Sequence, residues 1–459
     1  MMKTKLFLVL IFCATLLTGC KTWSGYNGTS ENYEYYHRSG KAKAWEEDII
    51  ELAARYLEIH PYLMDEEMLC YYYYFNQGWK NTFDAEKKEA FLSSVNQLIP
   101  QISKMTDLEV LYEMQKIVAT LGDFHSMLTD IPYDSGFPIM VQSFEDQGEL
   151  KYILLMAPEE YENLIYSELI SINGVSVSEI IEKLALYISS ENEYSTEAHA
   201  TNGGFYVSIQ NTQALKSIGI LGKDEYTATF EFRDEEETKT IELEILKASE
   251  MSSIKFINKT PMFMMEYFND EIHPETFWHK MLNDDLLYMQ ISSFSVDQEN
   301  PLIQCVSKVT KEVKSRESIN VIVDLRNNSG GRNLDGDKEL VELLKNENIK
   351  NVYVLINSGT ASQAVSYASR IDTEIEKAIL VGTPAAEGSE SLGYSYMSFY
   401  TMTNHGYSYG VANTWYQHVP EGKYNALYPE IVIYQNLEDY ENGVDTVIST
   451  ILEQHIKAK

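Results

Sequence analysis

VIVDLRNNSGG (321–331) and NVYVLINSGTASQA (351–364) are the two stretches of sequence that decide the fold. Each is a short apolar run that ends in small polar residues, which is the pattern of a buried strand followed by a turn. Between them, residues 337–345 have apolar side chains at helical spacing, so the predicted order is strand, helix, strand. This order is typical of a parallel sheet, in which ligands bind at the carboxyl ends of the strands. We therefore expect the chemistry of this chain at 328–331 and 358–362.

Ser362 lies between small residues at the predicted start of a helix. A serine at this position is often an ordinary helix cap. The same position also suits a nucleophile, because a strand-to-helix turn exposes the hydroxyl and leaves backbone N–H groups free to bind an oxyanion. Gly330 and Gly331 favour the nucleophile, since glycine lets the backbone approach a substrate and offers unhindered N–H donors.

Taken together, the segments DLRNNSGG (324–331) and YVLINSGTASQA (353–364) resemble the serine peptidase family of carboxyl-terminal processing (tail-specific) proteases and the tricorn core protease. In that family, the serine of a Thr-Ala-Ser stretch is the nucleophile, and an Asp-Leu-Arg-x-Asn-x-Gly-Gly stretch helps to form the oxyanion hole. The resemblance implies that Ser362 is the nucleophile. It also implies that the backbone N–H groups of Gly331 and Gln363 are the oxyanion donors.

His125 is the candidate general base. It follows Gly122 and Asp123 in a predicted turn after a helical stretch. A lone histidine is usually structural, but the tricorn-like branch of the family carries an Asp-x-His-Ser/Thr stretch at this place, with the histidine as base. A histidine base suits serine chemistry near neutral pH. The resemblance therefore implies that His125 pairs with Ser362, and we interpret Asp123 as a turn former.

The third member of the site has two candidates. The processing proteases use a lysine base after the serine, and the matching position here is Glu387, so a serine–lysine dyad is not expected. The tricorn-like branch uses a glutamate near the end of the domain, where this chain has Lys423, with Glu421 two residues earlier. The sequence leaves open whether Glu387, Glu421 or neither orients His125.

The first 20 residues, MMKTKLFLVLIFCATLLTGC, resemble a bacterial lipoprotein signal. The apolar stretch 6–17 is too short to span a bilayer comfortably, and it ends at a Leu-Thr-Gly-Cys site. Cleavage before Cys20 would leave a lipidated N-terminus, whereas the alternative is an ordinary secretory signal with an incidental cysteine. We expect a signal peptide at 1–19, a tether at 20–43, and a protein anchored by lipid to the cell envelope, facing outside the cytoplasm.

Three regions are predicted after the tether. Residues 44–130 have helical spacing and predict an α-helical N-terminal region. Residues 135–250 are β-rich, and the strand, Asn-Gly turn and helix predicted at 167–184 resemble a PDZ-like module. PDZ domains capture peptides by adding a strand to a sheet edge, although a plain β-rich linker domain is the alternative. Residues 260–459 are the predicted α/β catalytic domain, which by the family resemblance has a ClpP/crotonase-like βαβ core.

Composition excludes several classes of function. The formal net charge of −33 argues against nucleic-acid binding, which needs basic patches. The nine histidines and four cysteines show no metal-ligand spacing, and no cofactor is expected. Beyond the signal region, Cys70 and Cys305 either pair in an oxidising compartment or remain as two buried thiols.

The sequence therefore predicts an exported, lipid-anchored serine peptidase that cleaves peptides or unfolded protein tails through a Ser-His acyl-enzyme mechanism. One alternative is a catalytically inactive relative that captures peptide ends without cutting them, which the open third member favours and the retained Ser362 and His125 oppose. The other is a serine esterase or amidase on the same fold, because the same groups cleave esters.

Overall fold

The computed structural model describes residues 40–64, 82–146, 149–201, 207–234, 237–259, 276–294, 301–332, 335–394, 398–417 and 425–456. The predicted signal peptide, Cys20, Cys70 and Glu421 lie outside the described residues, so the predictions made for them stay predictions. Among the described residues, no helix combines the length and the apolar character that crossing a membrane requires.

The N-terminal region is helical, as predicted. Its first helix buries Trp45, Ile49, Leu52 and Tyr56, whose spacing places them on one face. A capping box begins the last helix, in which Thr106 and Glu109 satisfy each other's backbone N–H groups. The elements are α2 (Lys41–Ile59), α4 (Ala85–Leu98), η2 (Ile99–Lys104) and α5 (Asp107–Ala119).

A β-rich domain follows, also as predicted, with the sheet order β10-β4-β5-β7-β8. Strand β3 also pairs with β4, and β6 also pairs with β5. The strands are β3 (Met140–Asp146), β4 (Glu149–Pro158), β5 (Glu168–Ile172), β6 (Val175–Ser176), β7 (Thr227–Asp234), β8 (Glu237–Glu244) and β10 (Phe256–Asn258). A small pair, β2 (Ser135–Gly136) and β9 (Leu246–Lys247), lies beside it. The helices are η3 (Glu159–Leu164), α6 (Val177–Leu184), η4 (Ala185–Tyr187), α7 (Glu193–Thr201), α8 (Thr212–Ser217) and α9 (Ala248–Met251).

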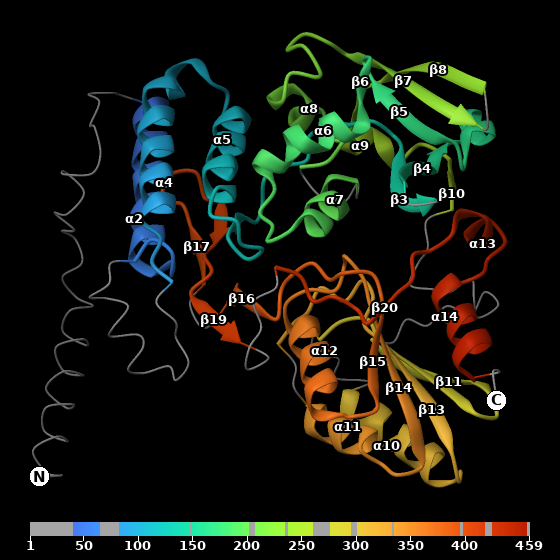
Figure 1. The fold of residues 1–459 in the computed structure, drawn as a ribbon. Coiled ribbons are helices and arrows are strands. Elements are labelled where there is room, and N and C mark those ends of the chain that lie inside the picture. The colour runs from blue at the N-terminus through green and yellow to red at the C-terminus, as the bar shows by residue number, and fades with distance from the viewer. Residues whose placement is uncertain are drawn as a thin grey trace, which may run out of the picture.

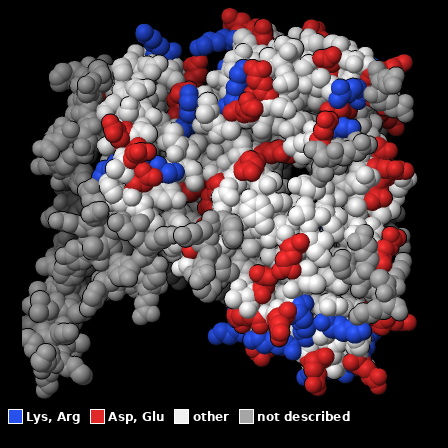
Figure 2. Space-filling view, viewed as in Figure 1, with Lys and Arg blue, Asp and Glu red and all other residues white. Residues whose placement is uncertain are grey.

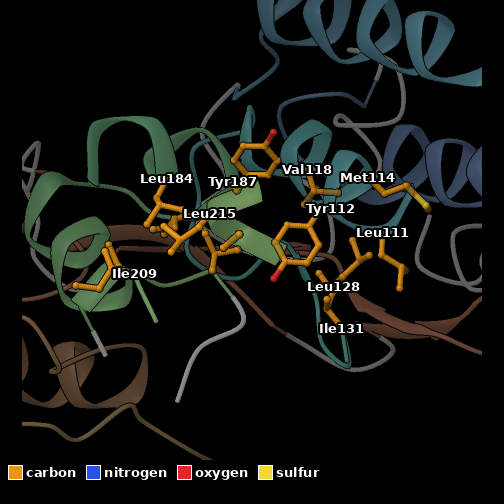
Figure 3. Packing of buried hydrophobic residues seen from close by; sticks show 14 of the residues in the cluster. Leu111, Tyr112, Met114, Val118, Leu128, Ile131, Leu184, Tyr187, Ile209 and Leu215 are labelled. Atoms are coloured by element: carbon orange, nitrogen blue, oxygen red, sulfur yellow. The ribbon is translucent and has the colours of Figure 1, made fainter. Parts of the chain in front are cut away.

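The helical region and the β-rich domain share one hydrophobic core. Side chains of α5 pack toward side chains on and next to α6 and α8 (Figure 3). From α5 these are Leu111, Tyr112, Met114 and Val118, and from the β-rich domain they are Leu184, Tyr187, Ile209 and Leu215. Burying this apolar surface stabilises the two regions against each other. The turn that carries His125 follows α5, so its position depends on this shared core.

The C-terminal domain contains the predicted strand–helix–strand unit at the centre of a six-stranded sheet (Figure 1). Strand order is β11-β12-β13-β14-β15-β20, and all pairs are parallel except the first. The strands are β11 (Phe277–Asn283), β12 (Leu286–Ile291), β13 (Ile319–Asp324), β14 (Ile349–Ile356), β15 (Ala378–Gly382) and β20 (Ile431–Val432). The α/β class predicted for this domain is therefore confirmed.

Helices cover both faces of this sheet. One core forms with α10 (Leu302–Lys314), α11 (Asp337–Leu344) and α12 (Gln363–Glu374). The other forms with α14 (Thr446–Thr450) and the π-helical turn η6 (Ile451–Ile456), which follow α13 (Leu437–Glu441). Strands β12 and β13 are buried along their whole length, which explains their continuous apolar sequence.

A segment of the C-terminal half crosses to the N-terminal helices. Strand β18 (Ser408–Gly410) pairs with β1 (Met127–Leu128) and with β17 (Phe399–Thr401). Between β17 and β18, the ring of His405 stacks on that of Trp45, with 3.8 Å between the ring centroids. Its Nδ1 lies 2.7 Å from Oδ2 of Asp48. A second pair, β16 (Glu390–Gly393) and β19 (Thr414–Gln417), flanks the crossing. Strand β1 begins two residues after His125, so the pairing of β1 with β18 helps to bring the histidine to the C-terminal domain.

Candidate active site

Ser362 lies in the turn between β14 and α12, at the carboxyl end of the sheet. It occupies the N-cap position of α12, but its side chain makes no cap hydrogen bond. Its backbone has φ 54° and ψ −121°, a conformation that costs a residue with a side chain free energy and that clusters at functional sites. The helix-cap interpretation therefore does not hold, and the hydroxyl is available for other contacts.

The glycine turn after β13 packs directly against the serine turn. A Cβ added to Gly330 would lie 2.7 Å from the Cβ of Ser362 and 2.8 Å from the backbone nitrogen of Gln363, so only glycine fits there. The N–H of Gly330 donates to Oδ1 of Asn328. In the part of the chain that the structure describes, the N–H groups of Gly331 and Gln363 have no hydrogen-bond acceptor. These are the two groups that the sequence predicts as oxyanion donors.

His125 is held by its backbone. Oδ1 of Asp123 accepts hydrogen bonds from the N–H of His125 at 3.0 Å and of Ser126 at 2.7 Å, which confirms Asp123 as a turn former. Oδ2 of Asp123 lies 3.0 Å from Nε2 of His60. Nδ1 of His60 accepts a hydrogen bond from the N–H of Tyr62 at 3.2 Å. Nε2 therefore carries the ring proton and donates a hydrogen bond to Asp123.

These donors keep Asp123 charged. Burial alone raises the pKa of Asp123, but the hydrogen bonds from His60 and Ser126 and the nearby His60 and His125 rings bring that pKa below its usual value. The side chain is only 1% exposed. The turn that carries His125 is thus tied to the helical region through a buried carboxylate.

The histidine and the serine meet across 237 residues of sequence. Nε2 of His125 lies 3.1 Å from Oγ of Ser362, within hydrogen-bond distance. On the other side of the ring, Nδ1 lies 2.9 Å from Oε1 of Glu387. With its proton on Nδ1, beside the carboxylate, the ring presents an acceptor at Nε2 to the serine hydroxyl.

Of the two candidates for a third member, the structure places Glu387 at the site, whereas Glu421 lies outside the described residues. Glu387 is fully buried, and its Oε2 accepts the backbone N–H of Ser362. The contact between Oε1 and Nδ1 of His125 is close, although its angle is not that of a linear hydrogen bond. Such catalytic contacts are often poorly aligned before substrate binds.

This carboxylate sets the protonation behaviour of His125. Burial by itself lowers the pKa of His125, but the Glu387 carboxylate, the charge of Asp123 and the backbone of Leu392 together outweigh burial. The pKa of His125 consequently lies above the ordinary value of a histidine. A base of this kind also gains a stabilised imidazolium when it takes up a proton.

Arg326 belongs to the glycine-turn motif but lies away from the reacting groups. Its guanidinium pairs with Asp324 at 2.6 Å and with Asp445 at 2.8 Å, and all three side chains are buried. The hydroxyl of Tyr288 donates to the same Asp324 carboxylate at 2.7 Å. Arg326 thus links the end of β13 to the N-cap of α14. No local pattern in the sequence points to Asp445 as its partner.

The remaining His, Cys, Asp and Glu side chains of the described residues offer no metal site. No group of three or more His, Cys, Asp or Glu side chains there could hold a metal ion. Cys305 is a buried free thiol, and burial raises its pKa to about 11. A thiol with a raised pKa is a poor nucleophile near neutral pH.

No protein-family model matches the sequence, and no curated protein matches it. Solved structures do match. Mature CPAF has a TM-score of 0.53 at 13% identity over 88% of this chain and 94% of that chain. Mature CPAF complexed with lactacystin has a TM-score of 0.54 at 13% identity, over 88% and 96%. A serine-to-alanine mutant of CPAF has a TM-score of 0.55 at 12% identity, over 88% and 95%.

At this identity the likeness establishes the fold. The chain has the α/β fold of mature CPAF, with a helical region and a β-rich domain before the six-stranded sheet. The tail-specific S41 peptidase family, which the sequence resembles, fits this fold.

Proposed function

We propose that this chain is a serine-type peptidase that cleaves peptides or unfolded protein tails. The observation that carries the proposal is the arrangement of Ser362, His125 and Glu387, in which serine Oγ lies 3.1 Å from one ring nitrogen and a carboxylate 2.9 Å from the other. A serine, a base and a group that orients the base form the nucleophilic unit of serine hydrolases.

The mechanism follows from the protonation state of the ring. His125 takes the proton of the Ser362 hydroxyl at Nε2 as Oγ attacks the peptide carbonyl carbon. The carbonyl oxygen becomes an oxyanion, which the backbone N–H groups of Gly331 and Gln363 stabilise. The imidazolium then gives its proton to the leaving amine, and an acyl-enzyme remains. Water, deprotonated by His125, releases the acyl group and restores the serine.

Glu387 orients His125 and stabilises the imidazolium that forms. Its second oxygen accepts the N–H of Ser362, so this N–H is directed to the carboxylate rather than to the oxyanion. One side chain therefore fixes both the base and the backbone of the nucleophile. A serine–lysine dyad is excluded at this position, because the residue there is a glutamate.

We also propose that the β-rich domain is a PDZ-like module that presents peptide ends to a ClpP/crotonase-like core. The turn Asn173-Gly174, with φ 50° and 76°, joins β5 to β6 before α6, and β8 stands at one end of the sheet. An edge strand can pair with an extended peptide. The net charge of −33, with acidic side chains spread over the face in Figure 2, favours the approach of cationic peptides.

Export and lipid anchoring at Cys20 belong to the same proposal and rest on the resemblance of residues 1–20 to a lipoprotein signal. Labelling of growing cells with a lipid analogue tests this part, with Cys20→Ala as the control. Loss of label in the variant is expected, and equal labelling of both forms would exclude Cys20 as the anchor.

Peptide cleavage tests the central part. The soluble chain from residue 21 is incubated with a peptide library, a set of unfolded proteins and simple esters, and the products are identified by mass spectrometry beside a Ser362→Ala control. Cut peptides from the wild-type chain alone support the peptidase. Ester cleavage without peptide cleavage supports the esterase alternative, and peptide binding without any cleavage supports the inactive relative.

A further inference from the structure

Two neighbouring residues of the β-rich domain reach the loop that carries Glu387. Asn192 lies just before α7, and its side chain is only 6% exposed. Its Nδ2 lies 3.2 Å from the carbonyl oxygen of Ala385, 2.9 Å from that of Ala386 and 2.8 Å from that of Asn425. These carbonyls belong to the C-terminal domain, more than 190 residues away in sequence.

Glu191 makes the complementary contact. Its Oε2 accepts the backbone N–H of Gly388 at 3.3 Å. Asn192 therefore binds the two residues before Glu387, and Glu191 binds the residue after it. We call these two side chains the Glu191–Asn192 clamp.

We propose that the Glu191–Asn192 clamp is a positioning device that sets the place of Glu387, so that the β-rich domain completes an active site whose reacting groups come from the other two regions. This inference rests on the proposed peptidase function. It assigns Glu191 and Asn192 no contact with substrate, and they act through Glu387.

Backbone bonds within the catalytic domain hold part of the loop that carries Glu387, and the clamp adds to them. Residues 383–389 join β15 to β16 and have no strand or helix of their own. From within the domain, the N–H of Ala386 bonds to Thr360, and Glu387 O accepts the N–H of Leu427. To these bonds the clamp adds contacts at the residues immediately before and after Glu387. A displacement of about 1 Å at a catalytic group can lower the rate roughly 100-fold.

The protonation behaviour of Glu191 fits this role. Burial raises the pKa of Glu191 well above its usual value, and the neighbouring Glu387 raises that pKa further, with Asp123 adding to it. A protonated Glu191 accepts the N–H of Gly388 without placing a second negative charge beside Glu387. Glutamine has the same shape as a protonated glutamate, so Glu191→Gln should preserve the clamp.

A substitution at Asn192 can separate its contacts with the loop from its capping of α7. Its Oδ1 accepts the N–H of Ser195 at 2.8 Å and so caps α7. Asn192→Asp keeps this cap but places an oxygen where Nδ2 now donates to three carbonyls. Ser176→Ala is the matched control, because Ser176 caps α6 in the same domain and its contact with Glu179 is exposed.

The test measures the rate at which a fluorophosphonate probe labels Ser362 in the soluble chain from residue 21, together with kcat and KM on a cleaved peptide. Thermal unfolding reports whether each variant is folded. For Asn192→Asp and Glu191→Ala we expect labelling and kcat to fall about 10- to 100-fold with little change in KM. Glu191→Gln and Ser176→Ala should stay within about three-fold of wild type.

Each outcome decides something different. Folded Asn192→Asp and Glu191→Ala chains that label at the wild-type rate would overturn the clamp while leaving the peptidase intact. A Glu191→Gln variant as slow as Glu191→Ala would refute the inference that Glu191 holds Gly388 in its protonated form. If Asn192→Asp does not fold, Asn192→Ser, which keeps a cap for α7 but lacks the amide nitrogen that donates to the three carbonyls, gives the same comparison. A folded wild-type chain that does not label at all would instead refute the proposed function.

Discussion

The two halves of the site are built in different ways. The serine half, Ser362 with the glycine turn 328–331, lies at the ends of the adjacent parallel strands β13 and β14, and backbone bonds such as Ala361 N–H to Asn328 O hold it together. The histidine half, His125 and Glu387, lies on two loops that are held by buried polar side chains, the first by Asp123 and the second by Asn192 of the β-rich domain. The sheet thus fixes Ser362, whereas buried side-chain contacts fix His125 and Glu387.

Removing either reacting group should abolish cleavage. For Ser362→Ala and for His125→Ala we expect kcat to fall about 10⁶-fold, and the double variant should be no slower than either single one, because the two residues act as a unit. Peptide cleavage followed by mass spectrometry measures this. Additive losses in the double variant would show that the two halves act independently.

Replacing Glu387 by glutamine should cost about 10²- to 10⁴-fold in kcat, because His125 loses the carboxylate that orients it. The pKa of His125 should also fall, since Glu387 is the charge that raises it. The base acts in its unprotonated form, so the acid limb of kcat/KM should move to lower pH in Glu387→Gln. An acid limb that stays at the wild-type pH would assign the orienting role to another residue, such as Glu421.

Removing the brace of the histidine half should have an intermediate effect. Asp123→Ala leaves the N–H groups of His125 and Ser126 without their acceptor, and His60 without its partner. We expect a loss of about 2–4 kcal/mol in the free energy of unfolding and a further ~10-fold loss in kcat. Chemical denaturation and steady-state kinetics measure the two effects. Wild-type stability and activity would mean that the turn needs no buried carboxylate.

Removing a brace of the serine half should have the smallest effect. The side chain of Asn357 accepts the backbone N–H of Asn327 at 2.8 Å and donates to Oδ1 of Asn327 at 2.9 Å, and so ties the ends of the two strands together. The strands and α12 hold the same turn, so Asn357→Ala should cost about 1 kcal/mol in stability and only a few-fold in kcat. A larger loss of kcat than in Asp123→Ala would reverse the comparison between the two halves.

The sequence predicts the serine half well because its signals are local. The apolar runs at 321–325 and 352–356 form β13 and β14, and the small residues after them form the two turns, as strand and turn preferences require. His125 was reachable from the sequence only through its motif and its place in the chain. Its distance from Ser362 depends on the crossing of β18 to β1, of which the sequence gives no sign.

The third member could not be chosen from the sequence. Glu387 lies on an irregular loop, and neither periodicity nor spacing tells a buried carboxylate from a solvated one there. The residue before it, Ala386, is bonded to Thr360 of the same domain and to Asn192, which lies 194 residues away in sequence. Arg326 is a similar case, because one of the two carboxylates that bind its guanidinium is Asp445, the N-cap residue of α14, 119 residues away in sequence. Contacts of this kind are properties of the packed chain.

The most direct test of the central claim, that His125 activates Ser362, is the pH dependence of fluorophosphonate labelling. The soluble wild-type chain and His125→Ala are compared across the neutral range, with the labelled residue identified by mass spectrometry. We predict that wild-type labelling of Ser362 rises through one step at a pH above the ordinary pKa of histidine, because Glu387 raises the pKa of His125. The variant should label at least about 10³-fold more slowly and without that step. Equal rates in the two chains, or the same step in both, would contradict the claim.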